Sequence, residues 1–233
     1  MNQFWKKVAQ LQWDDHRYYH QCRINQTLHL VSAMSFLVAY SLLFVNPAAA
    51  GIVGWLVGMV TRQSGHIFFE PRGYDHINDA SDAHKEAIKV GFNMRRKAIL
   101  IGIWLSIPVL LFVQSDLFGL IQPAVGVTAY LHELGLLWLS LGVAGWMFRT
   151  LHLFFLRGPV WGLAWATKIV LDPFHNVAGY WSSPFALLRG ERYDPIRPPH
   201  PASIESVFVT KSSLVCHEPV TAAAENFPHE HDQ

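Results

Sequence analysis

The stretch that decides the fold is INQTLHLVSAMSFLVAYSLLFVNPAAAGIVGWLVGMVT, residues 24–61, which contains no Asp, Glu, Lys or Arg. A helix of about 20 apolar residues crosses a bilayer core of about 30 Å, so this run has room for two crossings. The pair Asn46-Pro47 divides the run, and proline is a common break between helices. We therefore predict two membrane-spanning helices, residues 28–45 and 48–60, joined as a hairpin.

Two further apolar runs extend this predicted bundle. Residues 98–115 are uncharged, and residues 128–148 carry only Glu133. Residues 158–171 are also apolar, but they begin with Gly-Pro and include Lys168, which favours a helix at the membrane interface. The sequence predicts an all-α integral membrane bundle of about four transmembrane helices plus an interfacial helix. This domain is predicted to cover residues 1–188, followed by a polar, Pro-rich and partly disordered tail, residues 189–233.

Composition supports a membrane protein. Hydrophobic residues make up 51% of the chain and charged residues 15%, below the roughly 25% of soluble domains. The net charge of +1 does not supply the concentrated basic surface that nucleic acid requires, so no nucleic-acid partner is predicted. The chain has two cysteines, too few for a disulfide scaffold.

The basic residues predict the orientation. All eighteen Lys and Arg fall in residues 1–23, 62–97 and 149–233, and the connections at residues 46–47 and 116–127 contain none. Connections rich in Lys and Arg remain in the cytoplasm. Both termini are therefore predicted to be cytoplasmic, in a bacterial inner membrane or the endoplasmic reticulum.

Histidine is unusually frequent, with thirteen residues against eighteen Lys plus Arg. The predicted topology brings several of them to the cytoplasmic edge of the membrane, together with Glu70, which follows His66 by one helical turn. Imidazole and carboxylate ligands suit iron, zinc or copper, and two histidines with one carboxylate suit an Fe(II) ion that activates oxygen. The predicted metal ligands are His20, His29, His66, Glu70, His152 and His175.

Two stretches also resemble a known family. YHQCRINQTLH (residues 19–29) and GHIFFEPR (residues 65–72) are similar to the signature of the fatty acid α-oxidation dioxygenases of the endoplasmic reticulum and their bacterial relatives. The resemblance covers about the first third of the chain and departs from the family pattern at Gln21 and after Arg72. The matching positions are His20, Asn25, His29, Gly65, His66, Phe69, Glu70 and Arg72.

The resemblance implies an activity. Members of this family are Fe(II)-dependent membrane enzymes that shorten 2-hydroxy fatty acids by one carbon, with O₂ as co-substrate. A membrane lipid or fatty acid would be the substrate. Glu70 and Asn25 would take part in catalysis, Asn25 by orienting an imidazole or a bound oxygen. We expect the substrate carboxylate near Arg62, Arg72 or residues 95–97, because basic side chains pair with carboxylates.

Other functions remain open from the sequence. Two irons rather than one would make a lipid hydroxylase or desaturase, although such sites need about eight ligands by analogy with di-iron bundles. The chain can also be a haem-binding or structural subunit of a membrane complex, or a lipid-binding protein without catalysis. In the last case the histidines form a polar belt and Glu70 pairs with Arg72. A homo-oligomer is compatible with each of these functions.

Overall fold

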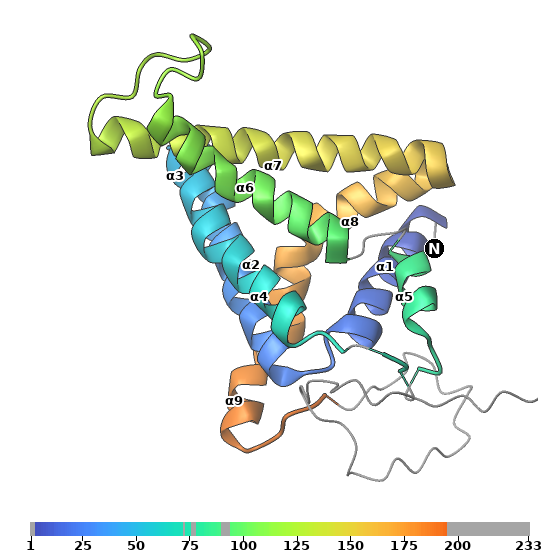
Figure 1. Ribbon diagram of the computed structural model, residues 1–233. Coiled ribbons are helices and arrows are strands. Elements are labelled where there is room, and N and C mark those ends of the chain that lie inside the picture. The colour runs from blue at the N-terminus through green and yellow to red at the C-terminus, as the bar shows by residue number, and fades with distance from the viewer. Residues whose placement is uncertain (1–2, 72, 76–77, 90–93, 195–233) are drawn as a thin grey trace, which may run out of the picture.

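The computed structural model describes residues 3–71, 73–75, 78–89 and 94–194. These residues form helices and no strand, so the predicted all-α class is confirmed (Figure 1). In chain order the elements are α1 (Gln3–Tyr19), α2 (Arg23–Leu42), α3 (Pro47–Ile52), the π-helix η1 (Val53–Met59), α4 (Val60–Phe68), α5 (Asp82–Ile88), α6 (Met94–Val113), α7 (Val127–Arg157), α8 (Pro159–Tyr180) and α9 (Ser183–Leu188).

The first hairpin forms where the sequence predicts it. Asn46 caps α3, its side chain accepting a hydrogen bond from the backbone N–H of Ala49 at 3.1 Å, and Pro47 begins the helix. From there α3, η1 and α4 follow one another without a gap to Phe68 and pack against α2. The hairpin therefore returns the chain to the level at which α2 began, which places the end of α4 beside the start of α2.

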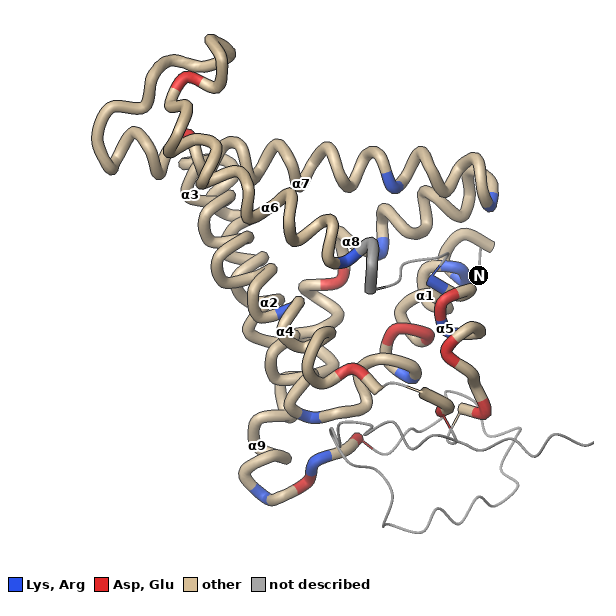
Figure 2. Tube along the Cα trace, viewed as in Figure 1, with Lys and Arg blue, Asp and Glu red and all other residues tan. Residues whose placement is uncertain are grey.

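The two connections that lack Lys and Arg lie at one corner of the molecule. The start of α3, the end of α6 and the start of α7 meet there (Figure 1), and no basic residue marks this corner in Figure 2. A buried cluster of Leu111, Leu134 and Trp138 packs against Trp55 and Trp104 nearby. The backbones of α3 and α7 approach closely at Gly51 and Gly135, where neither helix has room for a Cβ atom.

The segment predicted to lie at the interface forms α8 and continues to Tyr180. Gly158, with φ of +88°, ends α7, and Pro159 begins α8. The helix packs against α1, α2 and α7 and buries Lys168 and Asp172. One side of this helix therefore packs into the bundle and contributes polar groups to it, while side chains such as Leu163 and Phe174 are exposed.

The prediction of four membrane-spanning helices is wrong on length and composition. Within the described residues only α7 is both long and apolar enough to cross a membrane. Polar residues such as Asn25, Gln26 and Ser32 lower the hydropathy of α2. The return segment, residues 47–68, is divided among three shorter helices. The apolar part of α6, Lys97–Val113, is shorter than a membrane span.

The start of the predicted tail packs onto the domain. Tyr193 forms an isolated antiparallel bridge with Cys22, and the carboxylate of Asp194 forms an ion pair with Arg23 at 3.0 Å. Asp194 also accepts a hydrogen bond from Gln26 at 3.0 Å. These contacts tie residues 192–194 to the beginning of α2. The rest of the predicted tail, residues 195–233, lies outside the described residues.

Candidate metal centre

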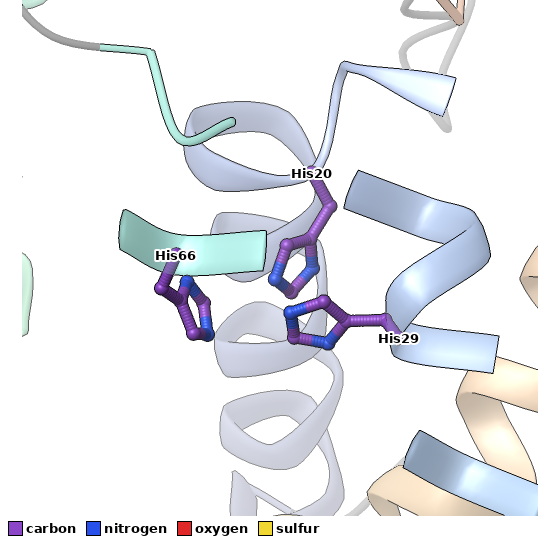
Figure 3. Close-up of side chains that lie close together, drawn as sticks. All are labelled: His20, His29 and His66. Atoms are coloured by element: carbon purple, nitrogen blue, oxygen red, sulfur yellow. The ribbon is translucent and has the colours of Figure 1, made fainter. Parts of the chain in front are cut away.

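Three imidazoles converge at the start of the hairpin (Figure 3). His20 lies in the connection between α1 and α2, His29 in α2 and His66 near the end of α4. Their ligand nitrogens all lie within 4.8 Å of one another, and the ring centroids of His20 and His29 are 4.0 Å apart. The sequence prediction that these three histidines come together is confirmed, and the group can hold a metal ion.

Gly65 allows this approach. A Cβ atom at this position would collide with the side-chain oxygen of Asn25 and lie 3.3 Å from Cδ2 of His29. Asn25 cannot easily move away, because it is fully buried and its amide donates to the carbonyl of Tyr19 at 2.8 Å. The glycine that precedes His66 therefore sets how closely α4 packs on α2.

Several atoms that face the centre have no hydrogen-bond partner. Nε2 of His20, both ring nitrogens of His29 and Oδ1 of Asn25 are buried and unpaired among the described residues. Buried polar atoms are nearly always satisfied, and an unsatisfied one costs about 1–3 kcal/mol. A metal ion would satisfy one nitrogen of each ring that binds it, so the donor set fits such an ion.

Burial also fixes the protonation state of two of these histidines. Removal from water lowers the pKa of His20 well below its ordinary value, and the positive charges around it act in the same direction. Burial lowers the pKa of His66 to about 4, although its hydrogen bond with Glu70 opposes the change. Both rings are therefore neutral at neutral pH, which is the form that binds metals.

Glu70 lies behind His66, as the four-residue spacing predicts. Its Oε2 is 2.9 Å from Nδ1 of His66 and accepts from Nζ of Lys97 at 3.1 Å. Burial alone would raise the pKa of Glu70, but the hydrogen bond with His66 and the charge of Lys89 hold that pKa below its usual range. An ionised carboxylate on Nδ1 turns the opposite nitrogen of His66 toward the other rings.

Tyr180 positions His20 in the same way, and no sequence pattern predicted this contact. Its hydroxyl lies 3.1 Å from Nδ1 of His20 and 3.4 Å from Nδ1 of His16. Tyr180 comes from the end of α8, 160 residues away in sequence. The helical spacing of His16 and His20 is the only local signal that could have suggested a shared partner.

Four buried or partly buried charges form a group close enough to the centre to act on His20. Nζ of Lys168 forms ion pairs with Asp15 and, at 2.8 Å, with Asp172. Arg62 contacts Asp172 at 3.2 Å. Burial by itself would raise the pKa of Asp15, but the charges of Lys168 and Lys89 lower it to about 2. Sequence reasoning noticed Lys168 only as an interruption of an apolar run.

Two predicted ligands lie elsewhere. His152, on α7, accepts a hydrogen bond from Arg149 at 3.0 Å and stacks on Phe148. His175 is exposed on α8. Neither joins the three imidazoles within the described part of the chain. Arg72, which the sequence offered as a partner for Glu70 or the substrate, lies outside the described residues.

No protein-family model, curated protein or solved structure matches this chain.

Proposed function

We propose that this protein is a membrane-associated, non-haem Fe(II) oxygenase that acts on a fatty acyl substrate with O₂. The observation that carries the proposal is the burial of three imidazoles whose free nitrogens face one another. Such an arrangement is costly without a ligand and fits a metal ion with coordination positions left open. A 2-hydroxy fatty acid is the proposed substrate, and its shortening by one carbon the proposed reaction.

The choice of iron and substrate rests on the resemblance of the two sequence stretches. Imidazole ligands suit zinc, copper, iron and nickel, so the ligand type alone does not choose among them. The stretches around His20 and His66 are the ones that resemble the α-oxidation dioxygenases, and they supply the convergent rings. When bound, Fe(II) supplies the oxygen chemistry that organic side chains lack.

The protein side chains have separate roles in this proposal. His20, His29 and His66 bind the metal, while Tyr180 and Glu70 hold two of the rings in position. The unpaired oxygen of Asn25 accepts a hydrogen bond from a protonated group bound at the centre. Burial of the rings keeps bulk water away from the reacting atoms.

Exposed apolar side chains support a lipid environment. Such side chains run along both α6 and α7, and α7 is long and apolar enough to enter a bilayer. Large contiguous apolar surfaces on a protein mark contact with a membrane or another protein. Examples are Ile99, Ile103, Val109 and Phe112 on α6, and Met147, Phe148, Leu151 and Phe155 on α7.

Metal analysis of the full chain purified in non-ionic detergent tests this proposal. We expect one iron per chain, oxygen uptake with 2-hydroxyhexadecanoate, and a product one carbon shorter. Alanine at His20, His29 or His66 removes a ligand and should lower bound iron by about 10-fold or more. His175→Ala is the matched control and should retain the iron, because His175 is exposed and lies apart from the three rings.

A protein without stoichiometric iron, or one that keeps its activity after His66→Ala, would refute the proposed enzyme. Two irons per chain would instead indicate a di-iron hydroxylase or desaturase. A haem absorption band in the visible spectrum would identify a haem-binding subunit.

A further inference from the structure

The charges around the centre fall into two groups that differ in balance. The first consists of Arg62 and Lys168 with Asp15 and Asp172, two cations with two carboxylates. Every member contacts a partner of opposite charge. This group is neutral overall and leaves no charge for a ligand to meet.

In the second group two lysines contact the same carboxylate. It consists of Glu70 with Lys89 and Lys97, one carboxylate for two ammonium groups. Lys97 approaches Oε2 of Glu70 to 3.1 Å, and the same oxygen faces His66. Lys89 and Lys97 therefore share the carboxylate of Glu70, and the other carboxylate that attracts Lys89, Asp15, is in contact with Lys168.

Lys89 is the less well satisfied of the two lysines. Its Nζ lies 3.5 Å from Oε1 of Glu70, outside the usual hydrogen-bond range of about 2.7–3.2 Å, and sits 3.1 Å from the ring centroid of Tyr19. An ammonium has three N–H donors, and no acceptor within the described residues takes one from Lys89. Burial accordingly lowers the pKa of Lys89 to about 8, against the attraction of Glu70.

Lys89 is also within reach of an incoming molecule. Its side chain is 17% exposed, whereas those of Lys97 and Lys168 are 6% exposed. His66 and Glu70, at 12% and 13%, share this partly open edge, while His20 and His29 are fully enclosed. A ligand that enters from this edge meets the ammonium of Lys89 next to a metal-binding histidine.

We propose that Lys89, with Lys97 behind it, binds the carboxylate of the amphiphilic acid on which the centre acts. This inference rests on the proposed function and adds the residue that selects an acid over an uncharged lipid. A carboxylate supplies the acceptors that Lys89 lacks among the described residues, in a charge-assisted hydrogen bond. Of the basic residues expected from sequence, Lys97 belongs to this site, whereas Arg62 is less suited because it is already paired with Asp172.

Binding of two probes to the full chain in non-ionic detergent tests this assignment. The probes are 2-hydroxyhexadecanoate and 1,2-hexadecanediol, which lacks the carboxylate. Lys89→Met should weaken binding of the acid by about 10- to 100-fold and leave binding of the diol unchanged, since charged hydrogen bonds contribute about 1.5–3 kcal/mol. Lys89→Arg should restore acid binding, and the exposed Lys6→Met is the control in the same detergent.

Thermal unfolding of the ligand-free variants separates a binding role from a structural one. Removal of a buried cation that lacks acceptors among the described residues should leave the melting temperature unchanged or raise it. A lower melting temperature for both Lys89→Met and Lys89→Gln would identify Lys89 as the structural partner of Glu70 and overturn the assignment. Equal weakening of acid and diol, or unchanged acid binding, would overturn it as well.

Metal content measured on the same samples keeps the two proposals apart. If the protein binds iron but Lys89→Met does not change acid binding, the carboxylate site is refuted and the proposed iron enzyme is not. Acid binding that depends on Lys89 in a protein without iron supports the carboxylate site and refutes the oxygenase.

Discussion

At the scale of single residues, the centre depends on which nitrogen of each ring is already engaged. Tyr180 engages Nδ1 of His20, and Glu70 engages Nδ1 of His66. Each partner fixes the ring's orientation and leaves the opposite nitrogen for a metal. His29 differs, since both of its nitrogens are unpaired among the described residues. Its ring is held in place by packing alone until a ligand binds.

Tyr180→Phe tests this positioning role. The change removes the hydroxyl that contacts His20 and keeps the aromatic ring, so we expect metal affinity to fall by about 10- to 100-fold. The melting temperature of the metal-free protein should change little, because one hydrogen bond contributes only about 1 kcal/mol. The measurement is titration with Fe(II) or Co(II) under anaerobic conditions.

Tyr40→Phe is the matched control, because its hydroxyl contacts the carbonyl of Val170 at 3.3 Å, away from the three rings. Wild-type metal affinity in Tyr180→Phe would show that packing alone orients His20.

At the scale of helices, the centre depends on how closely α4 approaches α2. Gly65 sets this separation, as Gly51 and Gly135 set it between α3 and α7. The π-helical segment η1 lies between these two contacts, and π-helical turns often occur near functional sites. The return segment is thus held by glycine contacts at both ends, and His66 lies at one of them.

Gly65→Ala should damage the centre even though alanine favours a helix. Its methyl group would collide with Asn25, which is buried and held by Tyr19, so we expect a loss of about 1–3 kcal/mol in unfolding free energy. Displacement of α4 should also lower metal content. Both effects are measured by denaturation in detergent and by metal analysis.

The comparison variant for this experiment is Gly102→Ala in α6, where a Cβ atom meets nothing within 4 Å. It should be neutral or slightly stabilising, by up to about 1 kcal/mol. If Gly65→Ala behaves like Gly102→Ala, the close approach of the two helices is not required.

The hairpin and the meeting of three imidazoles were accessible from sequence, because they follow from local signals. Asn46-Pro47 marks the reversal, and similar distances from it along the chain place His29 and His66 at the same level. The partners of these rings were not accessible. Tyr180, Lys89 and Lys168 reach the centre through the packing of α8 and the connection after α4, which no local pattern specifies. His152 and His175 were expected to be ligands for the same reason, because the sequence does not specify how α7 and α8 pack.

At the scale of the whole molecule, buried neutral histidines couple folding to pH. His66 has a pKa of about 4 when folded and about 6.5 when unfolded, so the unfolded chain binds more protons between these values. The metal-free protein should therefore lose stability as pH falls from 6.5 to 4, on the order of 3 kcal/mol from His66 alone. His20 acts in the same direction. Melting temperature measured against pH gives the profile.

The variant His66→Asn, which has no proton to gain in this range, should show a shallower profile. A profile that is as steep as that of the wild type would mean that His66 is accessible to protons in the folded protein.

The bridge between Cys22 and Tyr193 has a consequence for how the protein is made. A ribosome completes α2 and α4 long before it reaches the hydroxyl that holds His20, which is added 160 residues after that histidine. Asp194, which forms an ion pair with Arg23, is added later still. During synthesis the nascent chain thus carries half-oriented imidazoles, and their final arrangement awaits the last helices. Loading of the ion is for this reason expected only after Tyr180 and Asp194 have been added.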